Sequence, residues 1–323
     1  MQITNKFQTI VILIMVVLGI LLGQVEFIRS YSNYLIMPAL NIMLFLVFIQ
    51  IPLKNIVDSF KNIKFTLTSI CINFIWTPLL VYILGKFFLS TYPELYLGFL
   101  MLMVTPCTDW YIIFTENAKG NVALSTSILP LNLILQLLLL PIYIFLLGGS
   151  SISIDTLELG KSVIYSLIIP LFTAIVVRKI IIQKVGESIF TEKVASKACY
   201  YQGYFLNFAI TMMFSSQGKI LLENSYVLLI LLLPILLFFI INFILGKIVG
   251  KFIGFDYSDG VSLILTTLAR NSPIALAIAT AAFPSKPLIS LALIIGPLIE
   301  LPILFLVSKI LVSSKFKYSY PKI

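Results

Sequence analysis

Long apolar stretches recur along the whole chain and are separated by short segments that contain charged residues, glycine or proline. A helix needs about 20 apolar residues to cross the hydrocarbon layer of a bilayer. The pattern therefore predicts ten membrane-spanning helices, near residues 8–25, 34–53, 65–89, 96–118, 122–147, 160–182, 199–217, 225–250, 259–283 and 288–311. The seventh gives the weakest signal, because Gln202, Asn207 and several tyrosines interrupt it.

The composition also indicates a chain that lies mostly in lipid. Of its 323 residues, 60% are hydrophobic and 11% are charged, whereas about 25% of the residues in a soluble domain are charged. The predicted fold class is an all-α polytopic membrane protein surrounded by the lipid bilayer. There is no histidine and the three cysteines are scattered, so no disulfide framework, resident metal or other cofactor is expected. An enzyme is not expected either, since no nucleophile–base spacing stands out.

The formal net charge of +9 is explained by membrane topology. With the N-terminus inside the cell, the predicted cytoplasmic segments hold 16 of the 22 basic residues and the outer segments hold 5. Basic residues favour the cytoplasmic side, so both termini are predicted to be cytoplasmic and the protein to reside in the cell membrane. Nucleic-acid binding is not needed to explain the charge, and no obligatory protein partner is evident.

The ten spans divide into two sets of five, residues 1–150 and 151–323, which begin on opposite sides of the membrane. Inverted repeats of this kind are common in secondary transporters. The prolines support a repeat, because Pro106 and Pro273 are 167 residues apart, as are Pro130 and Pro297. The predicted architecture is one integrated membrane domain made of two inverted five-helix repeats.

The fourth and ninth predicted spans are both interrupted near their middle. The first interruption reads Pro106-Cys107-Thr108-Asp109 and the second Ala269-Arg270-Asn271-Ser272-Pro273. Proline removes a backbone donor, and lipid cannot satisfy the polar groups that a break exposes. Interrupted helices at matching positions of two repeats are typical of a transport site. The predicted substrate-binding residues are Cys107, Thr108, Asp109, Arg270, Asn271 and Ser272.

Three ionisable residues lie near the centres of their predicted spans: Asp109, Arg270 and Glu300. A charge at that depth costs about 2.5–3.5 kcal/mol, so each is expected to face a partner or a water-filled cavity. Asp109 and Arg270 either form a structural ion pair between the two breaks or take part in binding. One arginine against two carboxylates leaves a net negative charge, which a bound monovalent cation or a proton on Glu300 would neutralise.

Two amides on the fifth span extend this prediction. Asn132 and Gln136 are four residues apart and share one helix face, and they offer the oxygen atoms that hard cations prefer. Either they help to bind the ion or they form hydrogen bonds between helices. The predicted ion-coupling residues are Glu300, Asn132, Gln136 and Asp109, with Na+ or H+ as the coupling ion.

Cys107 is the cysteine with an unusual context. A lone buried cysteine is usually an inert small apolar side chain, and Cys71 and Cys199 are interpreted in this way. Cys107 lies beside a helix break and an aspartate. Its sulfur is either packed in the same manner or faces a cavity, where a thiolate would be a ligand for a soft partner such as a trivalent metalloid.

Three segments resemble the bile acid/sodium symporter superfamily, most closely its arsenite-efflux carriers and their bacterial relatives. They are VTPCTDW in the fourth span, LARNSPIALAIATAAFP in the ninth and IIGPLIELPIL in the tenth. The resemblance covers nearly the whole chain and implies two inverted repeats whose broken helices four and nine cross at the centre. It also implies a core of spans three to five and eight to ten that moves against a panel of spans one, two, six and seven.

By this resemblance, Cys107 matches the cysteine that arsenite carriers have in their fourth span. One departure lies in the ninth span, where the family typically has a glutamate and this chain has no carboxylate. Asp109 and Arg270 look like additions that come together, and Arg270 is therefore also a candidate to meet an anionic substrate.

The sequence thus predicts a secondary active transporter that couples efflux of arsenite or a related metalloid to an ion gradient by alternating access. The alternative is a sodium-coupled symporter of a small organic anion. A membrane enzyme or a sensor without transport is the third class, and no motif supports it.

Overall fold

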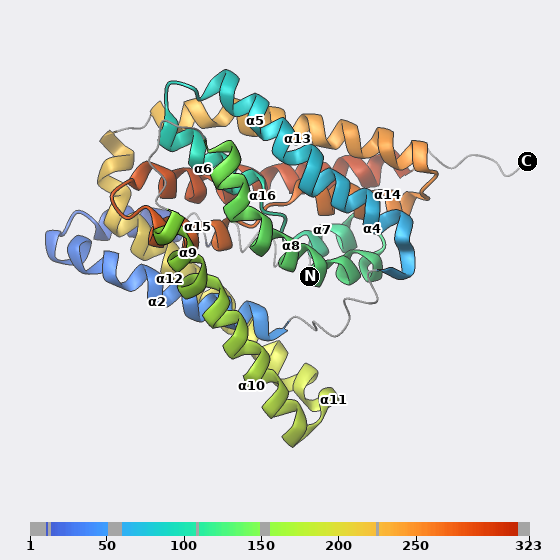
Figure 1. Cartoon of the computed structure of the whole chain (residues 1–323), viewed down its shortest axis with the longest axis horizontal. Coiled ribbons are helices and arrows are strands. Elements are labelled where there is room, and N and C mark those ends of the chain that lie inside the picture. The colour runs from blue at the N-terminus through green and yellow to red at the C-terminus, as the bar shows by residue number, and fades with distance from the viewer. Residues whose placement is uncertain are drawn as a thin grey trace, which may run out of the picture. The chain divides into compact units, whose positions relative to one another are not determined.

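The computed structural model describes residues 11, 14–50, 60–107, 110–148, 156–223 and 226–315 (Figure 1). These residues form helices joined by short turns, with an isolated antiparallel bridge between Pro106 and Arg270. Within the described ranges, six helical segments are long and apolar enough to cross a membrane: Glu26–Gln50, Ile63–Phe88, Val122–Leu147, Gly160–Val185, Leu229–Ile253 and Pro287–Ser313. The predicted all-α membrane fold is thereby confirmed, whereas the arrangement of ten helices as inverted repeats stays a prediction.

Four predicted spans, the first, fourth, seventh and ninth, correspond to helices that are not among these six segments. The fourth span is divided into α6 (Pro93–Met103) and α7 (Trp110–Asn117), and the ninth into α14 (Tyr257–Leu268) and α15 (Ser272–Ala282). Both divisions fall at the predicted breaks. The seventh span is α12 (Ser196–Glu223), which is long but is not among the six strongly apolar segments. The first span falls largely on residues 14–22, which are helical.

Contacts divide the chain into two compact units. Unit 1 comprises residues 1–52, 149–229 and 273–294, and unit 2 comprises residues 53–148, 230–272 and 295–323. Unit 1 thus contains the spans expected in the panel and unit 2 most of those expected in the core. The exceptions are residues 273–294 and the first residues of the eighth span, up to Leu229, which were expected in the core and belong to unit 1. Each predicted repeat, 1–150 and 151–323, contributes to both units.

Unit 1 is built around one long helix. Here α2 (Glu26–Gln50) packs along α12 and along α10 (Ile169–Val185). The remaining elements of this unit are α9 (Thr156–Val163), the π-helical turn η4 (Ile164–Ile168), α11 (Glu187–Ile189), the π-helical turn η5 (Phe190–Ala195) and α15. The helix α16 (Pro287–Lys315) begins in unit 1 and ends in unit 2.

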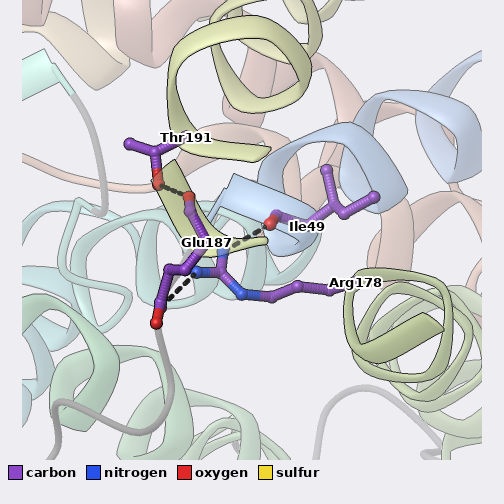
Figure 2. A network of polar contacts seen from close by, with 4 residues as sticks. All are labelled: Ile49, Arg178, Glu187 and Thr191. Atoms are coloured by element: carbon purple, nitrogen blue, oxygen red, sulfur yellow. Dashed lines mark hydrogen bonds and ion pairs between the residues drawn. The ribbon is translucent and has the colours of Figure 1, made fainter. Parts of the chain in front are cut away.

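An arginine fastens the end of α2 to the turn after α10, as Figure 2 shows. Arg178 donates a hydrogen bond to the Ile49 carbonyl (2.8 Å) and forms an ion pair with Glu187 (3.9 Å). Gly186, at φ 84°, ends α10 in a conformation that glycine adopts without strain, and this turn brings Glu187 back toward Arg178. The guanidinium group also lies over the Phe190 ring, 4.7 Å from its centroid.

Unit 2 contains both helix breaks. Its elements are the 3-10 turn η2 (Phe60–Asn62), α4 (Ile63–Cys71), the π-helical turn η3 (Ile72–Trp76), α5 (Thr77–Phe88), α6, α7, α8 (Val122–Leu147), most of α13 (Tyr226–Ile253) and α14. A cluster in its core joins α4, η3, α8 and α14 through Phe65, Ile72, Leu124, Ile128 and Leu263. These helices are the framework on which the interrupted segments are held.

Side-chain caps fix where α8 and α14 begin. Asn121 accepts a hydrogen bond from the Leu124 N–H (3.0 Å), and Asp256 accepts one from the Asp259 N–H (2.8 Å), which is the usual way in which Asn and Asp start a helix. The two starts are joined, because the Asn121 amide donates to the Asp259 carboxylate (2.9 Å). The helix that follows α7 and the first half of the ninth span are therefore anchored to each other.

Candidate functional site

The two interrupted segments of unit 2 cross and pair through their backbones. The Cys107 N–H donates to the Ala269 carbonyl (2.9 Å), and the Asn271 N–H donates to the Thr105 carbonyl (2.7 Å). These bonds form the antiparallel bridge between Pro106 and Arg270. The backbone groups that the breaks would expose to lipid thus satisfy one another, and the C-terminal ends of α6 and α14 meet at this crossing.

Arg270 binds the two helix ends together. Its Nε donates to the carbonyl of Leu268, the last residue of α14 (3.0 Å), and its Nη1 donates to the carbonyl of Met103, the last residue of α6 (2.9 Å). Its Nη2 donates to Asn73 Oδ1 (3.1 Å) and to the Thr267 carbonyl. The side chain is 3% exposed, and its guanidinium lies 5.2 Å from the centroid of the Phe238 ring.

Glu300 approaches the same crossing from α16. Its Oε1 accepts a hydrogen bond from the Arg270 backbone N–H (2.8 Å), and the residue is buried. Gly296 lies one turn earlier on α16, and a Cβ atom there would be 2.5 Å from the Leu102 side chain on α6. The absence of a side chain at Gly296 therefore lets α16 come close to α6, which brings Glu300 to the break. Glu300 and Cys107 both interact electrostatically with Arg270.

Asn132 and Gln136 lie in α8, which packs against α6, α7, α14 and η3. Both residues are fully buried, and no nitrogen or oxygen of either side chain has a hydrogen-bond partner within the described part of the chain. An unsatisfied buried polar group costs about 1–3 kcal/mol. Two such amides one turn apart indicate a place where water or an ion completes the polar contacts.

The remaining predicted residues fall into two groups. Cys107, Asn271 and Ser272 are buried at the crossing, with exposed fractions of 3%, 6% and 3%. Thr108 and Asp109 lie outside the described residues, so the predicted ion pair between Asp109 and Arg270 remains a prediction. Arg270, Cys107 and Asn271 lie together where the two breaks pair, and Glu300 reaches them from α16.

Asn73 is a site residue that the sequence analysis missed. It lies in the π-helical turn η3 and is fully buried, and its Oδ1 accepts the hydrogen bond from Arg270. Single π-helical turns within α-helices frequently mark functional positions. The available signal was a polar side chain in an otherwise apolar span, the same signal that singled out Asn132 and Gln136.

A cavity of about 480 Å³ lies elsewhere in unit 2, at the turn between α13 and α14. Lys247, Lys251, Asp256 and Tyr257 are among its lining residues, and none of the predicted site residues lines it. Within the described ranges, no three His, Cys, Asp or Glu side chains gather into a possible metal site.

Comparisons with known proteins point to transporters. The model of the Sodium Bile acid symporter family matches residues 37–224. The chain is 23% identical to the arsenical-resistance protein Acr3 of Alkaliphilus metalliredigens over 339 residues, 99% of this chain and 94% of that protein. It is 23% identical to Acr3 of Corynebacterium glutamicum over 248 residues, 73% of this chain and 66% of that protein. An uncharacterized transporter of Synechocystis is 20% identical over 97% of this chain and 89% of its own length.

Proposed function

This chain belongs to the Sodium Bile acid symporter family, and from this premise we propose that it is a secondary transporter that exports arsenite or a related metalloid across the cell membrane. It is a multi-pass membrane protein, and two of its relatives are arsenical-resistance proteins. Three features are proposed beyond these findings: arsenite or a related metalloid as the solute, export as the direction of transport, and an ion gradient as the source of energy.

The observation that carries the proposal is the position of Cys107 at the crossing. Of the three cysteines, Cys107 is buried whereas Cys71 and Cys199 are exposed. Its backbone N–H is fixed to Ala269, on the other interrupted segment. A thiol held between two broken helices is suited to a soft trivalent metalloid.

Sodium-coupled uptake of a small organic anion is the second candidate, because the family is described by sodium and bile acid. Arg270 would be the residue to meet such an anion. Its guanidinium donates four hydrogen bonds to Leu268, Met103, Asn73 and Thr267 within the protein. These bonds favour the metalloid over the anion, since few donors are left for a substrate carboxylate.

Ion coupling is assigned to Glu300, Asn132, Gln136 and Asp109, with H+ or Na+ as the ion. The support is the buried carboxylate at the crossing and the two buried amides without partners on α8. The topology proposed with it has ten spans, two inverted repeats (1–150 and 151–323) and both termini in the cytoplasm. The breaks at equivalent spans support this topology.

Proteoliposomes with an imposed proton or sodium gradient test the function directly. Arsenite is expected to move against its gradient, and a panel of organic anions, bile acids included, is not. Replacing Cys107 by serine is expected to reduce the arsenite flux at least about tenfold, since a thiol ligand is exchanged for a hard hydroxyl. Cys71→Ser is the matched control and should transport normally. Gradient-driven movement of an organic anion, with no arsenite flux, would establish the second candidate.

A substitution at Asn132 tests the ion site without any solute. Asn132→Leu removes an amide that has no partner in the described residues, so the purified apo-protein is expected to become more stable by about 1–2 kcal/mol. Asn242→Leu is the comparison variant and is expected to gain less stability, because Asn242 Oδ1 accepts a hydrogen bond from Trp76 Nε1 (3.0 Å) although its Nδ2 has no partner in the described residues. Thermal unfolding in detergent measures both. Asn132→Leu is also expected to lose gradient-driven flux. A destabilised Asn132→Leu protein would contradict the assignment of Asn132 to the ion site.

A further inference from the structure

The C-terminal ends of α6 and α14 present a set of oxygen atoms toward one point. The last carbonyl groups of a helix have no partner within the helix, and the end of each helix carries about half a negative charge. Here these groups are the carbonyls of Met103, Thr267 and Leu268. Asn73 Oδ1 adds a fourth oxygen from η3.

Such a set is the kind of site that binds a monovalent cation. Hard cations prefer carbonyl, amide and carboxylate oxygens, and in transporters the C-terminal ends of interrupted helices coordinate coupling ions. The Glu300 carboxylate, fixed to the Arg270 N–H, supplies a nearby negative charge. All of these groups favour positive charge at the crossing.

The positive charge is supplied by the protein. The Arg270 guanidinium donates to all four oxygens, is 3% exposed and is accompanied by the face of Phe238. Arginine keeps its proton at every accessible pH, so its charge remains whatever the ion concentration. A free cation would have to displace four hydrogen bonds to enter.

We propose that the Arg270 side chain is a tethered cation that fills a monovalent-cation site formed by the C-terminal ends of α6 and α14. The wild-type protein therefore needs no free cation at these four oxygens, and any Na+ or H+ used for coupling binds at other groups, such as the Glu300 carboxylate or the two amides of α8. Removal of the side chain opens the site to a free cation. The inference rests on the crossing and not on the identity of the solute.

The test is the thermal unfolding of purified protein in detergent without solute. Arg270→Ala is expected to have a lower Tm than wild type in choline chloride, because four acceptors lose their donor. Millimolar guanidinium or Na+, at constant ionic strength, is expected to raise its Tm by several degrees along a saturating curve, as for any ligand that binds only the folded state. The wild-type Tm is expected to show no such rise beyond the Na+ effect that an ion site elsewhere would give to every variant.

Two variants serve as controls. Arg270→Met fills the space without a charge and should stay unresponsive to both ions. Arg178→Ala also removes an arginine from a helix C-terminal carbonyl, that of Ile49, but it leaves no enclosed oxygen set and should not show saturable rescue. An Arg270→Ala protein that ignores both ions, or a wild-type protein with the same Na+ response, would overturn the proposal.

A second comparison covers the case in which Arg270→Ala does not fold. Arg270→Lys keeps a tethered charge, whereas Arg270→Gln has a similar length without one. The lysine protein is expected to have a higher Tm than the glutamine protein in choline chloride, because only the lysine side chain brings a positive charge to the four oxygens. Equal Tm values for the two without added ions would overturn the proposal. Because no solute is present, either failure would leave the arsenite proposal to be decided by the flux assay.

Discussion

Replacing Glu300 by leucine is expected to remove nearly all folded protein from membrane extracts. The buried Arg270 N–H would lose its acceptor, which costs about 1–3 kcal/mol. The buried guanidinium would also lose the electrostatic interaction with the Glu300 carboxylate, and an uncompensated buried charge costs about 3–5 kcal/mol. The sum is comparable to the whole stability of a typical domain. Size-exclusion chromatography of detergent extracts and the Tm of any recovered protein measure the effect.

Glu300→Gln separates the hydrogen bond from the charge. The glutamine side chain keeps an oxygen acceptor for the Arg270 N–H, so folded protein is expected at a reduced Tm. If Glu300 carries the coupling ion, gradient-driven flux is expected to be lost in this variant although the protein is folded. Equal yields for Glu300→Leu and Glu300→Gln would show that the hydrogen bond to Arg270 contributes nothing to folding.

The helix breaks could be predicted because they are marked by side chains. Pro106 and Pro273 interrupt the helix directly, and the neighbouring polar residues have no place in lipid. Long apolar segments without charged residues can be located equally well, and α8 begins at Val122 and ends at Leu147 as predicted. The prolines and polar residues at the breaks and the long apolar segments are both recognised from residue type alone.

The partners of Arg270 could not be predicted in the same way. The sequence suggests a carboxylate partner, Asp109, because residue type alone identifies a charged side chain. The structure shows three backbone carbonyls among the acceptors. Every residue has a carbonyl, so only the tertiary fold decides which ones are left unpaired at a helix end. Asn73 is marked in the sequence as a polar residue in an apolar span, but its partner Arg270 lies 197 residues further along the chain and is known only from the tertiary fold.

The division into units was predictable in outline. Segments that share a unit were implied by the resemblance, with residues 273–294 as the main exception. This exception begins one residue after α15 starts, at the second break. A proline that interrupts a helix uncouples the two halves, so the packing of the second half is not set by that of the first. The sequence pattern predicts where the helix is interrupted, but it does not predict which helices each half packs against.

Close packing in unit 1 depends on two glycines near the N-terminal end of the described chain. A Cβ atom at Gly23 would lie 2.4 Å from the Ser215 carbonyl oxygen, and one at Gly19 would lie 2.7 Å from the Thr211 carbonyl oxygen. Ser215 Oγ donates a hydrogen bond to the Gly19 carbonyl (3.1 Å). Small residues that let backbones approach are a main source of helix association in membranes, because lipid offers no hydrophobic driving force.

Gly23→Ala is therefore expected to lower the stability of unit 1 by about 1–3 kcal/mol, the usual cost of overpacking. The obstacle is a backbone carbonyl, which cannot rotate away as a side chain would. Gly203→Ala in α12 is the matched control, since nothing lies within 4 Å of its added Cβ and alanine favours a helix over glycine by up to about 1 kcal/mol. Thermal unfolding in detergent should show a lower Tm for Gly23→Ala and an equal or higher Tm for Gly203→Ala. The same Tm for both variants would mean that α12 does not approach Gly23 as closely as described.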